Sequence, residues 1–431
     1  MEIGIIGTGD MGKIYAREFS RAGYKVNCSD LPENRENLEK NLAGTGVNIL
    51  DDGVAVSRSS DLIFYLVPIE SLEKAVIHSG PSTKKDAIVS SGTSVMAPSV
   101  DAFEKYLPSD VNIINWHWLF GPSIKPQGQR TALVNHRSNK IAFQRGISAF
   151  ETIKTKIIEL PTYLEHDQIT ADTQAATHVG FESMGTAWKN MGIFPWENQT
   201  YFGGIDNIKV LMCLRIYVGK SHVYSGLAIH NFYAKQQIKQ YANSVFNLFS
   251  LMIQEDEGKF RERILKVKEG IFNNGDSPIL LDDKVMGNFS LEIPTKERTP
   301  NSHLSLLSMA DAWYQSNVNP YKNMLCQTPL FRLRLGIVEN LFRNSELLEE
   351  TIQAALQDKK LRRDDLEFQT AVREWSTIIG NSDIASYHRH FNETKKFFAN
   401  RIPEGKNKSD QLLEKLREYG PAQDRTADSS M

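Results

Sequence analysis

A glycine-rich turn near the N-terminus constrains the fold of this chain more than any other feature. The strand-like run MEIGIIG leads into the sequence GTGDMG at residues 7–12, and an amphipathic segment follows it. In this context Gly7 permits a tight turn, Gly9 lets the backbone approach a pyrophosphate, and Gly12 lets the next helix pack closely on the strand. The helix N-terminus then offers free N–H groups and a positive dipole end to phosphate oxygens. The pattern predicts a dinucleotide-binding βα turn.

The residues alone leave the choice between NAD and NADP open. Asp30 lies at the end of the second predicted strand, roughly 20 residues beyond the turn, where an acid would hydrogen-bond the adenosine 2′-hydroxyl of NAD. Arg35 and Lys40 follow it, and they could either neutralise the 2′-phosphate of NADP or remain solvated charges on an exposed helix. The predicted cofactor-binding residues are Gly7, Thr8, Gly9, Asp10, Met11, Gly12 and Asp30.

The length of the chain, 431 residues, favours two domains, because a single hydrophobic core stops growing near roughly 250–300 residues. In the first part of the chain, short β-rich runs alternate with helical stretches, which is typical of a parallel sheet with crossover helices. The predicted strands are Ile3–Ile6, Tyr24–Cys28, Leu62–Leu66, Ala87–Ser90, Val111–Asn115 and Ala132–Val134, and the predicted helices include Met11–Ala22, Ser71–Ile77 and Ile141–Thr155.

Beyond Leu160 this alternation stops, and helical periodicity takes over. We therefore predict an α/β, Rossmann-like dinucleotide-binding domain at residues 1–160 and a mostly α-helical domain at residues 161–402. Residues 403–431 are polar and contain few apolar side chains, so we predict a flexible tail there.

Charge and cysteine content argue against several classes of function. The formal net charge is −2, so no global field draws in nucleic acid or an anionic membrane, and local arginines must hold any anionic substrate. The cysteines Cys28, Cys213 and Cys326 are far apart in sequence, which argues against a metal site or a disulfide framework. No apolar run approaches the roughly 20 residues of a membrane helix, and the strand-like N-terminus leaves no room for a cleavable signal. We expect a cytoplasmic protein.

Three further stretches resemble motifs of the prephenate dehydrogenases. Residues 116–122 (WHWLFGP) resemble their HPMFGP motif, and residues 165–178, which contain EHDQ and QAATH, resemble their EHDQ and QALRH signature. Residues 328–335 (TPLFRLRL) resemble their SPIYRLEL stretch. The segments ITADTQAATH and PNSHLSLL and the paired segments NIKVLMCLRIY and HVYSGLAI make the chain most similar to the fungal-type, NADP-using members.

This resemblance implies a reaction, a cofactor and an assembly. The reaction is the oxidative decarboxylation of prephenate to 4-hydroxyphenylpyruvate in tyrosine biosynthesis, and the cofactor is NADP. The helical domain is implied to bind substrate and to form a homodimer.

The resemblance also implies roles for individual residues. His117 matches the catalytic histidine, and a neutral imidazole with a pKa near ~6.5 can accept the proton of the substrate hydroxyl. Ser94, or Thr93 beside it, matches the position that orients this imidazole. His178 matches a histidine that lines the substrate pocket, and Arg332 matches the arginine that binds a substrate carboxylate.

Other residues near these motifs have less specific interpretations. Arg334 is on a different face of its predicted helix from Arg332, so we interpret it as structural. Asp167 is interpreted either as a helix cap or, together with His166, as half of an acid–base dyad. Met96 stands where many relatives have a lysine, so a contact between that lysine and substrate cannot be carried over.

Three competing functions are considered. An arogenate dehydrogenase would use the same mechanism on a substrate with an amino group in place of the keto group. The β-hydroxyacid dehydrogenases share the GxGxMG start and a helical second domain, but the motif of their catalytic lysine is not found here. A non-enzymatic NADPH sensor would have no need of Ser94, His117, His178 and Arg332 together.

Overall fold

The computed structural model describes residues 1–122, 124–201, 203–272, 286, 299–322 and 328–418. The chain divides into two compact units, Met1–Thr170 and Ala171–Met431. The boundary therefore lies ten residues later than the predicted one at residue 160, because the helix Tyr163–Thr170 packs on the sheet of the first unit. Each unit is described separately below.

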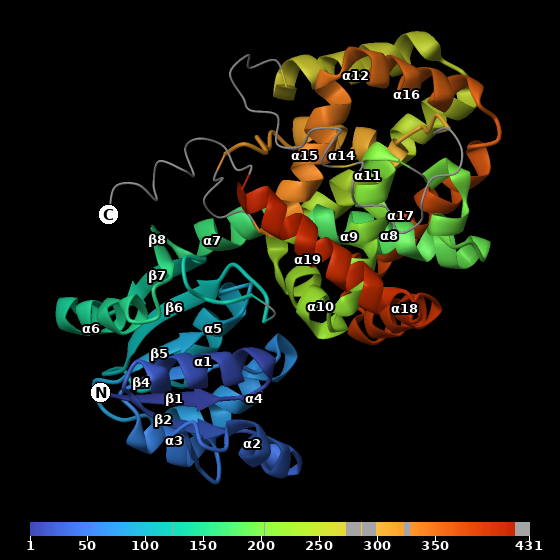
Figure 1. The fold of residues 1–431 in the computed structure, drawn as a ribbon. Helices are drawn as coiled ribbons and strands as arrows, with labels where there is room; N and C mark the ends of the chain where they lie inside the picture. Colours follow the sequence, from blue (N-terminus) through green and yellow to red (C-terminus); the bar gives the residue numbers. More distant parts are fainter. Residues whose placement is uncertain (123, 202, 273–285, 287–298, 323–327, 419–431) are drawn as a thin grey trace. The chain divides into compact units, whose positions relative to one another are not determined.

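The first unit is built on one eight-stranded sheet (Figure 1). Its strands are β1 (Glu2–Ile6), β2 (Lys25–Ser29), β3 (Asn48–Ile49), β4 (Leu62–Tyr65), β5 (Ile88–Ser91), β6 (Asn112–Trp118), β7 (Arg130–Arg137) and β8 (Lys156–Leu160), in the spatial order β3-β2-β1-β4-β5-β6-β7-β8. The predicted parallel sheet is correct except at one pair. β6 and β7 are antiparallel, since no crossover helix lies between them to return the chain.

Helices cover both faces of this sheet. They are α1 (Asp10–Arg21), α2 (Arg35–Leu42), α3 (Gly53–Ser59), α4 (Ile69–Ser79), α5 (Ala97–Tyr106), α6 (Lys140–Glu151) and α7 (Tyr163–Thr170), with short 3-10 turns at Pro32–Asn34 and Gly80–Ser82. The alternation of strand residues determines which helix packs where: Phe64 belongs to the core under α1, α2 and α6, whereas Tyr65 belongs to the core under α3, α4 and α5. The result is a three-layer α/β/α, Rossmann-like unit.

Two predicted boundaries in this unit were wrong. The strand predicted at Val111–Asn115 continues to Trp118, so His117 lies inside β6 rather than after it. The helix predicted at Ile141–Thr155 ends at Glu151, and the following residues pair with β7 as strand β8. Each error arose because tertiary pairing extends or replaces what local sequence pattern indicates.

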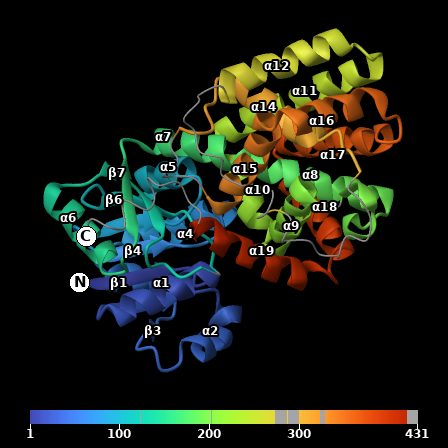
Figure 2. The ribbon, with the colours of Figure 1, turned by 45° about the horizontal axis from the view of Figure 1, so that its top comes forward.

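The second unit is helical. Its helices are α8 (Ala176–Met191), α9 (Gly204–Val218), α10 (Ser221–His230), α11 (Phe232–Gln254), α12 (Glu257–Phe272), α14 (Leu304–Gln315), α15 (Pro329–Arg343), α16 (Ser345–Gln357), α17 (Arg362–Gly380), α18 (Ile384–Phe397) and α19 (Ile402–Glu418), with the π-helical turn η3 (Ala171–Ala175) and short turns at Pro195–Glu197 and Gln199–Tyr201. Residues 176–188 of α8 are buried on all sides, which is typical of a central helix. Helices α9, α11, α17 and α18 pack around α8 (Figure 2).

The expected flexible tail at residues 403–431 is wrong for its first part. Helix α19 extends to Glu418, and its side chains Leu412 and Leu413 are buried. Gly405 lies so close to Leu214 of α9 that a Cβ would stand 2.6 Å from its Cδ1 atom. This apolar contact holds α19 against α9 despite its polar composition, and residues 419–431 lie outside the described residues.

Candidate active site

The turn between β1 and α1 has the geometry of a pyrophosphate cradle. Gly7 has a φ of +88°, and a Cβ there would stand 2.5 Å from Val67. A Cβ on Gly12 would stand 2.6 Å from the carbonyl oxygen of Gly7, so only glycine lets the helix start this close to the strand. Gly9 is exposed, and no atom of the described chain lies within 4 Å of its would-be Cβ. No side chain among the described residues caps the N-terminus of α1, which leaves its first N–H groups for a ligand.

These features fit a dinucleotide, with its pyrophosphate beside Gly9 and the first turn of α1. Asp10 is exposed at the start of that helix, and Met11 packs against the core beneath it. Thr8 is buried, and its hydroxyl donates to the carbonyl of Ser29 at 2.9 Å. The open side of the turn is therefore backbone.

Asp30 is engaged inside the chain. Its carboxylate accepts hydrogen bonds from the N–H of Thr8 at 2.7 Å, from the N–H of Leu31 at 2.7 Å and from the side-chain amide of Asn34 at 2.9 Å. Its contact with Thr8 ties the end of β2 to the glycine turn. Asp30 thus shapes the cradle itself, and this role does not require NAD.

Two glycine variants separate the roles of this turn. We expect Gly9→Ala to leave the free energy of unfolding unchanged or raised by up to about 1 kcal/mol, because its Cβ enters open space. The same Cβ would occupy the ligand's approach, so KM for the dinucleotide should rise roughly tenfold or more. Gly12→Ala should raise KM and also destabilise the protein by about 1–3 kcal/mol, since its Cβ meets backbone. Equal unfolding energies for the two variants in urea titrations would contradict this account.

A buried hydrogen-bonded chain of three side chains lies at the end of β6. The Nδ1 atom of His117 is 2.9 Å from the Nε2 atom of His166 on α7. The Nδ1 atom of His166 is 2.8 Å from a carboxylate oxygen of Asp167. The two carboxylate oxygens of Asp167 also accept the N–H groups of Met96 at 2.7 Å and Ala97 at 2.9 Å. All these atoms belong to the first unit.

The partners fix the protonation pattern of this chain. Two backbone donors at the N-terminus of α5 stabilise the ionised form of Asp167. An ionised Asp167 accepts a proton-bearing Nδ1 of His166, so the Nε2 of neutral His166 is an acceptor. His117 then donates its Nδ1–H to His166, which leaves the lone pair of its Nε2 to accept a proton. The network prepares His117 as a base.

The sequence interpretation of His166 and Asp167 separated two roles that the structure combines. Asp167 satisfies N–H groups at the start of α5, not at the start of its own helix α7, and it holds His166 at the same time. The EHDQ motif contained the signal, but its partners Met96 and Ala97 are remote in sequence. Met96, at the position of the family lysine, contributes its backbone N–H and a fully buried side chain.

The predicted residues of the first unit gather at one edge of the sheet. The glycine turn follows β1, Ser94 follows β5, and His117 lies near the end of β6. Because β1, β5 and β6 run in the same direction, their carboxyl ends meet at the edge where ligands of such folds bind. Ser94 is half-buried, and the Nδ1 of His117 is bonded to His166 instead.

In the second unit, the predicted substrate residues lie on α8 and α15. The ring of His178 meets the ring of Tyr224 edge to face at a centroid distance of 4.9 Å. Burial lowers the pKa of His178 to about 4, so its imidazole is neutral, and its Nδ1 has no hydrogen-bond partner in the described chain. Arg332 is half-buried near the start of α15, whereas Arg334 is completely buried.

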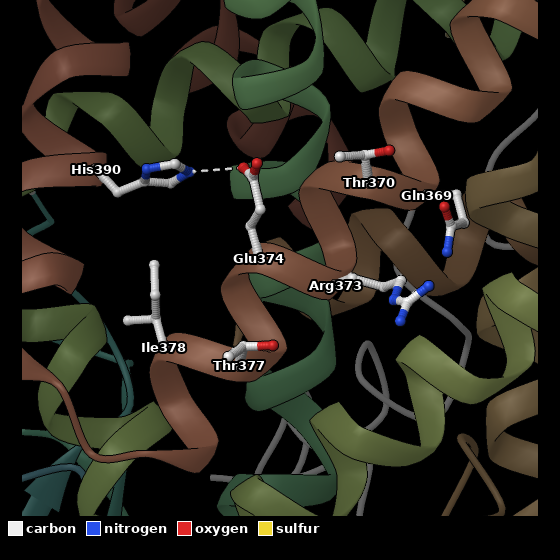
Figure 3. Close-up of a pocket in the computed structure, with 7 residues that line it drawn as sticks. All are labelled: Gln369, Thr370, Arg373, Glu374, Thr377, Ile378 and His390. Carbon is white, nitrogen blue, oxygen red and sulfur yellow. Dashed lines mark ion pairs between the residues drawn. The ribbon is translucent and has the colours of Figure 1, made fainter.

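A surface pocket on α17 and α18 is separate from all of these residues. Figure 3 shows its lining, which includes Glu374 and His390 with their nitrogen and oxygen atoms 3.3 Å apart. No residue predicted from the sequence lines it. Within the described ranges, no three or more His, Cys, Asp or Glu side chains are placed to hold a metal ion. In the same ranges, every helix is too short or too polar to cross a membrane.

Two family models match the chain. Residues 175–418 match the model described as a 6-phosphogluconate dehydrogenase C-terminal domain, and residues 2–94 match the model described as NADP oxidoreductase, coenzyme F420-dependent. A solved prephenate dehydrogenase from A. aeolicus, in complex with hydroxyphenyl propionate and NAD+, is similar in fold. Its TM-score is 0.52 at 17% identity, and the match covers 62% of this chain and 96% of that one.

Two fungal relatives match nearly the whole chain. A prephenate dehydrogenase (NADP+) from Saccharomyces cerevisiae is 43% identical over 99% of this chain and 95% of its own length. A probable prephenate dehydrogenase (NADP+) from Schizosaccharomyces pombe is 41% identical over 97% of this chain and 98% of its own length. With this level of identity over nearly full length and a matching model for most of the helical unit, the chain belongs to the family of NADP-dependent prephenate dehydrogenases.

Proposed function

We propose that this protein oxidatively decarboxylates prephenate to 4-hydroxyphenylpyruvate and CO2 with reduction of NADP, as a step of tyrosine biosynthesis. The observation that carries the proposal is the chain from Asp167 through His166 to His117, which prepares a neutral base at the carboxyl edge of a dinucleotide-binding sheet. The names of the two fungal relatives support the substrate and the cofactor.

The chemistry requires one base and two places for carboxylates. Prephenate carries a ring carboxylate, a pyruvyl carboxylate and a hydroxyl on the ring carbon that loses hydride. NADP, when bound, supplies the hydride acceptor. The Nε2 of His117 accepts the hydroxyl proton as the C–H bond breaks, and His166 and Asp167 stabilise the imidazolium that forms. The C–CO2 bond then breaks, its electron pair completes the aromatic ring, and the proton returns to the phenol oxygen.

The pH dependence of the reaction follows from the burial of His117. Burial, and secondly the nearby His166, lower the pKa of His117 well below its ordinary value. A lowered pKa keeps the imidazole neutral, and therefore active as a base, at more acid pH. We expect kcat/KM for prephenate to hold its plateau down to pH ~6.5 and to halve only below it. A half-maximal value of kcat/KM above that pH would contradict the assignment.

Residues of the helical unit are proposed to hold the substrate. His178 is a neutral imidazole with an available Nδ1, which can hydrogen-bond a keto or carboxylate oxygen. Arg332 is proposed to pair with one carboxylate, as its motif suggests. Ser94 is proposed to lie beside the base and to contact its imidazole or the substrate hydroxyl once both ligands are bound.

Substrate and cofactor assays test the proposal. Purified protein should form NADPH from prephenate and NADP, with a lower kcat/KM for NAD and for arogenate. Turnover of arogenate alone would assign the protein to the arogenate dehydrogenases. Absence of turnover with both substrates, in a folded preparation that binds NADPH, would favour the sensor function.

We also propose that the helical unit forms a homodimer and that the protein works in the cytoplasm without nucleic-acid partners. Phe232, Phe246 and Ile253 on α11 are exposed and are spaced by multiples of seven residues, so they share one side of the helix. An exposed apolar stripe of this kind suits a second copy of the chain. A monomeric mass in sedimentation equilibrium would refute the dimer. The buried free thiols Cys28 and Cys213 accord with a reducing compartment, and Cys326 lies outside the described residues.

A further inference from the structure

A cation without a carboxylate partner lies in the interior of the helical unit. Arg334 on α15 has no exposed surface, and arginine remains protonated at physiological pH. Its Nη2 donates to the carbonyl of Ser305 at 2.7 Å and to the hydroxyl of Tyr241 at 3.4 Å. Its Nε and Nη1 have no hydrogen-bond partner among the described residues. A buried charge with unused donors is strongly unfavourable unless an anion completes the site.

The helices that touch this guanidinium offer it no free acid. Helix α11, which carries Tyr241, contains no aspartate or glutamate. Helices α8, α14 and α15 contain one carboxylate each, and each is already bonded to another side chain. These pairs are Glu182 with Tyr387, Asp311 with Arg263, and Glu339 with Tyr321. Within the described ranges, the neighbouring helices therefore leave the charge of Arg334 uncompensated.

The surroundings hold the guanidinium in one orientation. The carbon at its centre lies 4.8 Å from the centroid of the Phe181 ring. A Cβ on Gly180 would stand 3.1 Å from Nη2 and 3.2 Å from Nη1, so the absence of a side chain there makes room for the planar group. The carbonyl of Ser305 fixes one end. A guanidinium fixed by an aromatic face and a backbone acceptor is preorganised for a planar anion.

We propose that Arg334 binds a carboxylate of the substrate inside the helical unit, beside the carboxylate assigned to Arg332. The inference rests on the proposed function, because prephenate brings two carboxylates and the sequence motif supplied one arginine for them. It reverses the structural interpretation of Arg334 made from helical spacing. The apo protein tolerates an unpaired buried cation because the ligand completes it.

The test compares Arg334→Met with Arg263→Met in the full-length protein. Methionine removes the charge and retains much of the apolar stem. Arg263 is the matched control, since it already has a buried carboxylate partner in Asp311, with which it forms two bonds of 2.8 Å. The readouts are Tm without ligand, the rise in Tm caused by 4-hydroxyphenylpyruvate, and KM for prephenate and for NADP.

We expect Arg334→Met to keep or raise the ligand-free Tm, because an unpaired buried charge disappears. KM for prephenate should rise roughly 100-fold with KM for NADP unchanged, and the product should no longer raise Tm. Arg263→Met should lower Tm and leave KM for prephenate unchanged, since it orphans Asp311.

A lower Tm for Arg334→Met with an unchanged KM and an unchanged product effect would show a structural role and overturn the inference. Loss of a Tm rise caused by tyrosine, with KM for prephenate unchanged, would assign the site to another carboxylate and overturn it equally. Failure of the wild-type protein to turn over prephenate would refute the proposed function instead. In that case a loss of ligand-free Tm in Arg334→Met as large as in Arg263→Met would refute the present inference as well.

Discussion

Replacing His117 with asparagine is expected to lower kcat for prephenate by roughly 10²–10⁴-fold, the usual contribution of a positioned general base. Asparagine can retain a hydrogen bond to His166, but it has no lone pair that accepts a proton near neutral pH. KM for NADP should stay within about twofold, since the glycine turn is untouched. Steady-state kinetics on both substrates measure the two effects separately.

The matched control for this variant is His136→Asn. His136 is a half-buried histidine of the neighbouring strand β7, and it bonds Glu104 at 2.9 Å. It has no part in the proposed chemistry, so kcat should be unchanged. A His117→Asn protein with the kcat of His136→Asn would show that the base is another group.

The second large effect is expected from Asp167→Asn. The amide can offer one acceptor, whereas the carboxylate serves His166 and two backbone N–H groups. With the amide oxygen on the backbone, the amide nitrogen faces the Nδ1 of His166 and reverses its tautomer. His117 would then accept at Nδ1 and carry its proton on Nε2, where the base is needed. We expect kcat to fall roughly 10²–10³-fold, in line with other misoriented catalytic histidines.

Stability should change as well in this variant. One N–H group of the α5 N-terminus loses its acceptor, which should lower the free energy of unfolding by about 1–2 kcal/mol in urea titrations. Asp101→Asn is the control, since Asp101 is an exposed carboxylate on the same helix. If Asp167→Asn loses stability but retains kcat, the carboxylate only caps α5 and the relay is wrong.

The parts of the site that are local in sequence could be predicted. The glycine turn was recognisable because its spacing and its two flanking elements are contiguous, and the structure gives Gly7 and Gly12 the close contacts that this spacing implies. The alternation of strands and helices was visible for the same reason. His117 was identified by its motif, but its strand was drawn too short, because the buried run through Trp118 has no polar residue to mark its end.

The parts that depend on distant contacts could not be predicted. Asp167 meets Met96 across 71 positions of sequence, and no local pattern reports that pairing. The tail was misjudged because α19 is mostly polar, and its few buried leucines acquire meaning only against α9. Arg334 was judged by its place on a helical wheel, whereas its burial depends on helices α8, α11 and α14 around it.

The stoichiometry of the wild-type reaction tests the central claim most directly. Purified protein would be incubated with limiting prephenate and excess NADP, and NADPH, CO2 and 4-hydroxyphenylpyruvate would be quantified together, beside His117→Asn. The account predicts equal amounts of all three products from the wild-type protein and almost none from the variant in the same time. NADPH without CO2, or equal product formation by the variant, would contradict it.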